Sequence, residues 1–189
     1  MTTRPRLSEL LDRLSRLVTA RLHADGLVPA QWQALRYLAR ANRFSRSPKA
    51  LTLFLGATKG TVSQTIIALE RRGLVSKSGN PADLRTVRLD LTAAGSEALG
   101  RDPLAELGDV LHGLPVDRRR RLEGDLAAAL SLIIGESGGR PFGLCAQCRH
   151  FLRGEGVPVR HCGLLDVELS EADSLLICQE QEPRPVPAL

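Results

Sequence analysis

Two segments decide the fold of this chain: GTVSQTIIALERRGLV at residues 60–75 and NPADLRTVRLDLTAAG at residues 80–95. In the first segment apolar residues recur at helical spacing, and Gly73 supplies the stop for a helix that starts at Thr58. In the second segment apolar and polar residues alternate over 86–91, which predicts a strand paired with residues 74–77. Residues 78–85 are rich in turn formers, so we expect a hairpin with a polar tip.

Three further helices are predicted before this stretch and two after it. Leucines recur at helical spacing over residues 7–22, and two helices are expected from Pro29 onward and over 48–55. Beyond the hairpin, helices are expected over 92–111, with an interruption, and over 115–134. The order of a short helix, a glycine turn and a longer helix holds the longer helix out toward a DNA major groove about 12 Å wide.

The start of this longer, fourth helix carries the kinds of side chain that meet phosphates and base edges in DNA-binding helices. They are Thr58, Lys59, Thr61, Ser63 and Gln64. Apolar residues such as Val62 and Ile66 fall on the other face and are expected to be buried. Taken by itself, the pattern also suits an ordinary amphipathic surface helix with a capping threonine.

Charge is divided unevenly along the chain. The net charge is +5, but the residues from 141 onward carry seven acids and four bases, which leaves +8 on the first 140 residues. A basic body favours a polyanionic partner, and nucleic acid is the usual one. Neither an apolar run long enough for a membrane span nor a signal-peptide pattern is found, so we expect a cytoplasmic protein without a membrane partner.

The two deciding segments together resemble the MarR family of bacterial regulators. The resemblance consists of a T-V-S helix start leading to L-E-x-R-G-L-V, a D-x-R wing tip at Asp83 and Arg85, and an L-x-L-T-x-x-G exit over residues 89–95. With Gln31-Trp32-x-x-Leu35 in the second helix, it spans roughly residues 7–136. No single piece of this combination is specific by itself.

The resemblance implies a mainly α-helical winged helix-turn-helix with a small β-hairpin wing. It also implies a homodimer, held by the first, fifth and sixth helices, that places two recognition helices in successive major grooves. In this arrangement Arg85 enters a narrow minor groove, where the negative potential is enhanced, and Asp83 holds the wing cations in position. The alternative for Asp83 and Arg85 is a surface ion pair of little energetic value.

All four cysteines lie in the last quarter of the chain, at Cys145, Cys148, Cys162 and Cys178. In a cytosolic protein such clustering favours metal or redox chemistry over structural disulfides. A C-x-x-C pair places two thiolates on one metal, and single cysteines from later turns complete a tetrahedral zinc site. Four thiolates are equally the usual complement of an iron–sulfur cluster.

This cysteine segment resembles small zinc modules and, more closely, the high-potential-type [4Fe–4S] modules of small glycyl-radical-enzyme subunits. The shared features are a C-x-x-C-x-x-F opening and two later isolated cysteines. We therefore favour a [4Fe–4S] cluster, with zinc as the alternative and four unmetallated thiols as the third reading. His150 and His161 are expected to donate hydrogen bonds near the site rather than to act as ligands.

These patterns predict four regions. They are a DNA-binding and dimerisation domain at 1–136, a glycine-rich linker at 137–143, a four-cysteine metal module at 144–182 and a disordered tail at 183–189.

The predicted function is that of a transcriptional regulator that binds double-stranded DNA sequence-specifically. We expect a repressor that responds to a small-molecule effector or to the redox or metal state of its cysteines. One alternative is an iron–sulfur enzyme or electron-transfer component that uses the winged helix as a scaffold, and another is a protein-interaction adaptor. The sequence contains no Gly-rich nucleotide loop, no Ser/His/Asp grouping and no paired acids in a credible pocket, so we expect no enzymatic activity.

Overall fold

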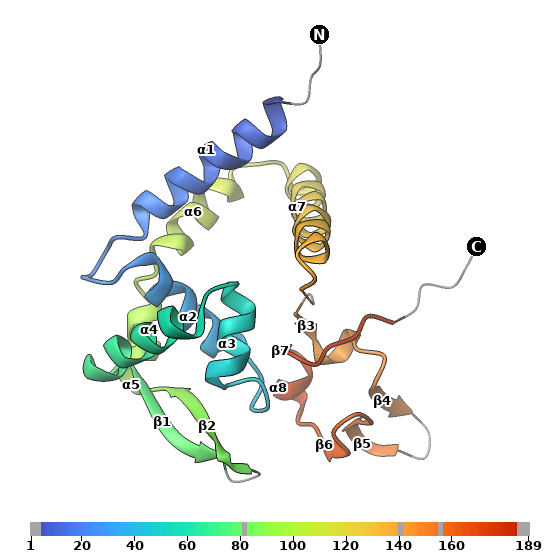
Figure 1. Cartoon of the computed structure of the whole chain (residues 1–189). Coiled ribbons are helices and arrows are strands. Elements are labelled where there is room, and N and C mark those ends of the chain that lie inside the picture. Colours follow the sequence, from blue (N-terminus) through green and yellow to red (C-terminus); the bar gives the residue numbers. More distant parts are fainter. Residues whose placement is uncertain (1–4, 81–82, 140–141, 155–156, 185–189) are drawn as a thin grey trace.

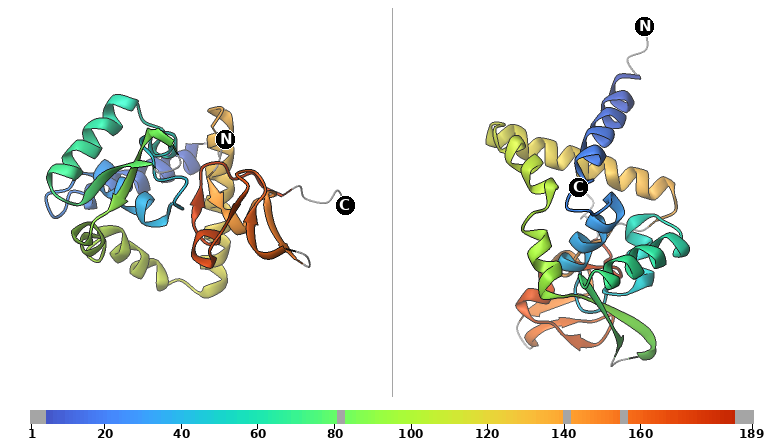
Figure 2. Two further views of the ribbon diagram at one scale, coloured as in Figure 1. Left: turned by 90° about the horizontal axis from the view of Figure 1, so that it is seen from below. Right: turned by 90° about the vertical axis from the view of Figure 1, so that its left-hand side faces the viewer.

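A computed structural model of the chain describes residues 5–80, 83–139, 142–154 and 157–184. Three helices form the upper part of the molecule in Figure 1: α1 (Pro5–Arg21), α6 (Pro103–His112) and α7 (Val116–Glu136). α1 and α6 lie side by side, and the right-hand view of Figure 2 shows α1 extending away from the rest of the chain. Within the described residues, no helix is long and apolar enough to cross a membrane.

The head, as we call residues 29–99, contains most of the core. Its elements are α2 (Pro29–Arg40), α3 (Pro48–Leu55), α4 (Lys59–Arg71), β1 (Val75–Asn80), β2 (Asp83–Leu91) and α5 (Ala93–Leu99). Side chains of α2, α3 and α4 meet in the centre, where Trp32, Leu51 and Leu69 are all fully buried. Gly56 ends α3 with a φ of 59°, a left-handed conformation that glycine adopts without strain, and this sharp turn allows α4 to start at once.

The β-hairpin is longer in its strands and shorter at its tip than the sequence predicts. Backbone pairing runs antiparallel from Val75 with Leu91 as far as Asn80 with Asp83, with one irregularity after Gly79. The polar residues expected to form a loose loop over 78–85 therefore belong largely to strands. Turn-forming residues had suggested a loop, but ladder hydrogen bonds to the opposite strand satisfy the backbone there.

The C-terminal segment, residues 142–184, consists of short strands in two small antiparallel sheets. β3 (Gly143–Leu144) pairs with β7 (Ile177–Cys178), and β4 (Phe151–Gly154), β5 (Val157–Cys162) and β6 (Val167–Glu168) form a second antiparallel sheet. A short 3-10 turn, η1 (Cys145–Gln147), and a one-turn helix, α8 (Glu171–Ser174), complete it.

This segment packs against the head. Ile177 is part of the same buried core as the head, and Phe142 stacks edge-on against Tyr37 and Phe54. Gly143, which the sequence places in the linker, belongs to β3 and pairs with Cys178 because the chain returns to close a two-stranded sheet.

The first two residues of the predicted tail, 183 and 184, lie in the described part of the chain. Arg184 donates to the Cys148 carbonyl at 3.3 Å, whereas residues 185–189 lie outside the described part of the chain. The division into the predicted domain, linker and module stays a prediction.

Candidate functional site

The first turn of α4 presents a row of exposed polar side chains. Its members are Thr58, Lys59, Thr61, Ser63 and Gln64, the residues predicted from the sequence to bind DNA. The Thr58 hydroxyl caps the helix, accepting a hydrogen bond from the Thr61 backbone N–H at 3.2 Å. The remaining N–H groups and the positive end of the helix dipole make such a turn favourable for an anion such as a phosphate.

The opposite face of α4 is buried in the core of the head. Val62, Ile66 and Leu69 are at most 3% exposed. Thr65, which the sequence analysis did not single out, is buried as well and satisfies its hydroxyl by donating to the Thr61 carbonyl at 2.9 Å. The polar face is therefore held in a fixed orientation by the packing behind it.

The predicted wing residues Asp83 and Arg85 belong to β2 by their backbone, but their side chains lie outside the described residues. Their roles in binding DNA stay predictions. The described base of the wing carries a different charge cluster, in which Arg46 Nη1 and Arg88 Nε lie 2.9 Å and 2.8 Å from the Asp90 carboxylate. Burial alone would raise the pKa of Asp90, but the hydrogen bonds from Arg88 and Arg46 outweigh it and lower the pKa.

All four cysteines line one pocket in the C-terminal segment. Cys145, Cys148 and Cys178 are 6–7% exposed, Cys162 is half-buried, and all four are free thiols. The remaining lining residues are Phe151, Leu164, Leu165, Leu169 and Glu180. Four cysteines that are spread over more than thirty positions of the sequence therefore line the same pocket.

Two of the sulfur atoms receive hydrogen bonds from nitrogen donors. Asn42 Nδ2 donates to Cys145 Sγ at 3.1 Å, and the Glu182 backbone N–H donates to Cys148 Sγ at 3.5 Å. A hydrogen bond between Cys145 and Cys178 lowers the pKa of Cys178 to about 6 and raises the pKa of Cys145, which burial raises further.

The metal prediction itself remains a prediction. Across the described ranges, no three or more His, Cys, Asp and Glu side chains are arranged so that they could hold one metal ion. His150 and His161, which we expected to donate near the site, instead lie 3.6 Å from Glu182 Oε1 and 3.0 Å from Asp166 Oδ1. Asn42 supplies the side-chain donor, and sequence reasoning missed it because it lies 103 residues before Cys145.

A second cavity, of about 240 Å³, lies where α2, α3 and β7 meet. Its lining residues are Gln33, Arg36, Tyr37, Arg40, Phe54, Leu55 and Ile177. Arg36 is held by a bidentate ion pair with Asp102 at 2.6 Å and 2.8 Å. The mixture of aromatic walls and arginines suits a small anionic molecule.

Comparison with known protein families finds one match, over part of the head. Residues 25–86 match the model of the MarR family, which is 62 of the 189 residues of the chain. No curated protein matches the chain.

Solved structures share the MarR-type fold at low sequence identity. A MarR transcriptional regulator from Methanosarcina mazei is 20% identical with a TM-score of 0.60, over 70% of this chain and 99% of that one. The S. aureus MepR–DNA complex is 19% identical with a TM-score of 0.55 over the same shares. A mutant of MarR from E. coli is 24% identical with a TM-score of 0.53, over 69% of this chain and 98% of that one. The part of this chain beyond the matched share has no counterpart in these three structures.

Proposed function

We propose that this protein is a transcriptional regulator that binds double-stranded DNA through the start of α4 and through the wing. The observation that carries the proposal is the exposed polar turn at Thr58–Gln64, mounted on a MarR-type winged helix whose opposite face is buried. The fold neighbour MepR from S. aureus is described in complex with DNA, and the positive charge of the first 140 residues suits the same partner. Thr61, Ser63 and Gln64 would meet phosphates and base edges, and Arg85 the minor groove.

The regulator would act as a homodimer. α1 and α7 each expose an apolar stripe that the rest of the described chain leaves uncovered: Leu7, Leu10, Leu14 and Leu17 on α1, and Leu126, Leu130 and Ile133 on α7. Exposed stripes of this length on two helices favour burial against a second copy about a two-fold axis. A two-fold dimer would present its two α4 helices to half-sites about one turn of DNA apart.

A small-molecule effector would occupy the cavity between α2, α3 and β7. The fold neighbour PcaV from Streptomyces coelicolor is described in complex with its natural ligand. Arg40 would neutralise an acidic group there, and Tyr37 and Phe54 would contact an apolar or aromatic body. Because α3 supports α4, a molecule bound there could alter DNA affinity, which is the behaviour of a ligand-responsive repressor.

The test is binding of the full chain to duplexes selected from a pool of about 30 random base pairs, long enough for two half-sites. Lys59→Ala should weaken binding and reduce the slope of log affinity against log salt by about one per protomer, because one phosphate contact is lost. Arg71→Ala removes a cation from the far end of the same helix and serves as the matched control. Equal losses in the two variants, or no selected duplex at all, would contradict the proposed interface.

A further inference from the structure

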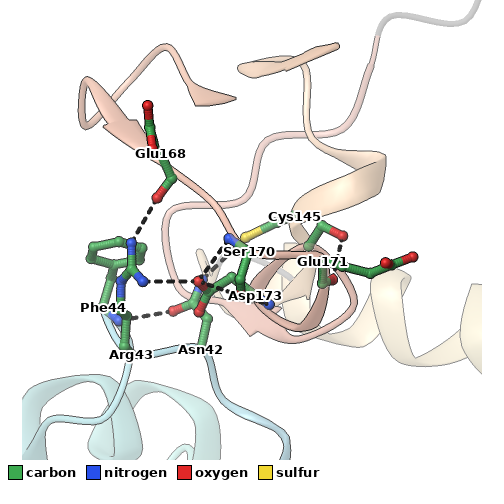
Figure 3. Close-up of polar contacts among 9 residues, drawn as sticks. Asn42, Arg43, Phe44, Cys145, Glu168, Ser170, Glu171 and Asp173 are labelled. Atoms are coloured by element: carbon green, nitrogen blue, oxygen red, sulfur yellow. Dashed lines mark hydrogen bonds and ion pairs between the residues drawn. The ribbon is translucent and has the colours of Figure 1, made fainter. Parts of the chain in front are cut away.

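The connection between α2 and α3, residues 41–47, touches the cysteine pocket directly. Asn42 is fully buried, and its side chain donates to Cys145 Sγ while its backbone N–H donates to the Ile177 carbonyl at 2.9 Å. Ser45 is also fully buried, and its hydroxyl accepts a hydrogen bond from the Gln179 N–H at 2.9 Å, next to Cys178. Figure 3 shows Asn42 reaching toward Cys145.

An ion pair fastens the same connection to the rim of the pocket. Arg43 Nη1 lies 3.0 Å from Asp173 Oδ2, and Arg43 Nη2 donates to the Glu168 carbonyl at 2.7 Å (Figure 3). Asp173 is only 7% exposed and also accepts hydrogen bonds from Ser170, at the start of α8. A buried carboxylate with this many partners fixes the position of Arg43.

The other end of the connection holds the DNA-binding elements. The Arg46 carbonyl accepts a hydrogen bond from the Leu89 N–H of β2 at 2.8 Å, and the Arg46 guanidinium pairs with Asp90. Ser47 caps α3 by accepting from the Ala50 N–H at 3.1 Å, and α3 packs against α4. Seven consecutive residues therefore join the cysteines to both the wing and the helix that supports the recognition helix.

The pocket has the chemistry of a thiolate metal site. Its walls of Phe151, Leu164, Leu165 and Leu169 exclude water, and N–H donors aimed at sulfur stabilise bound thiolates and tune the charge of a metal centre. Four thiolates are the usual complement of a [4Fe–4S] cluster, whose properties depend on hydrogen bonds to the sulfurs. The N–H donors to Cys145 and Cys148 therefore favour a cluster over a single zinc ion.

We propose that Cys145, Cys148, Cys162 and Cys178 hold a metal centre, a [4Fe–4S] cluster, and that residues 41–47 transmit its presence to the wing and to α3. When the cluster assembles from two ferrous ions, two ferric ions and four sulfides, each iron exchanges its water ligands for sulfide and one cysteine Sγ, the thiol protons leave to solvent, and no oxidation state changes. The bound cluster fixes Asn42 and Ser45, and through Arg46 it fixes the base of the wing. The transmission part rests on the proposed function, because its consequence is a change in DNA affinity.

The metal site is tested on the full chain, purified without oxygen or reconstituted with equal ferrous and ferric iron and sulfide. We expect about four iron and four sulfide per chain with a cluster absorption band, and their loss in Cys148→Ser. Arg160→Ala breaks an exposed ion pair with Glu171 inside the same segment and should retain the cluster. If the protein contained one zinc per chain and no iron, the metal centre would be a zinc ion and the cluster would be refuted. If no preparation contained metal, the proposed metal site would be refuted.

The transmission is tested with two readouts. Hydrogen exchange of the Asn42, Gln179 and Leu89 amides should slow by about tenfold on cluster binding, because their acceptors become fixed. Affinity for a selected duplex should change by about tenfold between cluster-bound and cluster-free protein, within the usual range of coupling between two sites. Arg43→Ala should keep the cluster but reduce both differences, whereas Arg160→Ala should keep them.

The outcomes separate the two proposals. Unchanged exchange at Leu89 in a protein that demonstrably binds the cluster overturns transmission, whatever the DNA result. Slowed exchange without binding to any duplex preserves the coupling and overturns the proposed function instead. Equal DNA affinity with and without the cluster leaves a structural metal and dismisses the sensor.

Discussion

At the scale of single residues, charge pairs at the base of the wing contribute to its position. Asp90 accepts from two arginines, one on its own strand and one from the connection between α2 and α3. The sequence offered no sign of this cluster, because Arg46 and Asp90 are 44 residues apart and Asp90 occupies a variable position of the L-x-L-T-x-x-G motif. The exposed residues of α4 were predictable because helical periodicity separates a polar from an apolar face within one segment.

Asp90→Asn should lower the free energy of unfolding at neutral pH by about 1 to 2 kcal/mol, because two partly buried guanidinium groups lose a charged acceptor. The pKa of Asp90 is lower in the folded chain than its ordinary value of 3.8. Its contribution is therefore complete above pH 3.8 and is lost as the pH falls through the lowered pKa. Urea unfolding should show a difference in free energy of unfolding between wild type and variant that disappears in acid. The control is Asp12→Asn, which removes a highly exposed ion pair with Arg16 and should leave the free energy of unfolding almost unchanged. If the stability difference between wild type and Asp90→Asn did not depend on pH, the role given to the Asp90 carboxylate would be contradicted.

At the scale of elements, the helices could be predicted closely and the hairpin less so. Helix ends depend on local signals, and Thr58, Gly56 and Thr92 act as caps where the sequence places them. The extent of the hairpin depends on pairing between residues on different strands, which turn-forming residues alone do not reveal. Gly95, the last residue of the L-x-L-T-x-x-G motif, acquires a physical role: a Cβ there would overlap the Leu74 carbonyl oxygen.

Gly95→Ala should lower the free energy of unfolding by about 1 to 3 kcal/mol, since the obstacle is backbone and the start of α5 must shift. Gly124→Ala is the matched control in the interior of α7, where an added Cβ meets nothing within 4 Å. It should leave stability unchanged or raise it by up to about 1 kcal/mol through better helix propensity. Thermal or urea unfolding measures both, and similar effects in the two variants would remove the proposed close approach.

At the scale of the whole molecule, the packing of the C-terminal segment against the head could not be predicted from the sequence. The glycines around residues 135–143 predicted a linker that separates the cysteine segment from the head, yet Phe142 and Ile177 pack in the core of the head. Such contacts depend on the three-dimensional path of more than a hundred intervening residues, and no local pattern encodes them. The four cysteines line one pocket, and their spacing in the sequence had suggested a common site.

Leu130→Glu should convert the proposed dimer into a monomer at micromolar concentration, because a carboxylate placed in the apolar stripe of α7 loses its hydration without gaining a partner. Light scattering measures the mass. Arg120→Glu introduces the same charge on α7 outside the stripe and should leave the dimer intact. A wild-type chain that scatters as a monomer would refute the dimer and the paired half-sites with it.

Trp32, the one tryptophan of the chain, sits fully buried in the core of the head, and its indole Nε1 has no hydrogen-bond partner among the described residues. Because this single tryptophan lies in an apolar site, its intrinsic fluorescence reports on the folding of the head without a label. Its emission should be shifted to the blue, and every change in that emission reports on one place, where α2 packs against α4. Tyr37, the one tyrosine, lies on the same helix and donates to the Ser45 carbonyl at 2.6 Å, so energy transfer between the two rings stays within α2. Opening of the head could therefore be timed in unlabelled protein, without any probe attached.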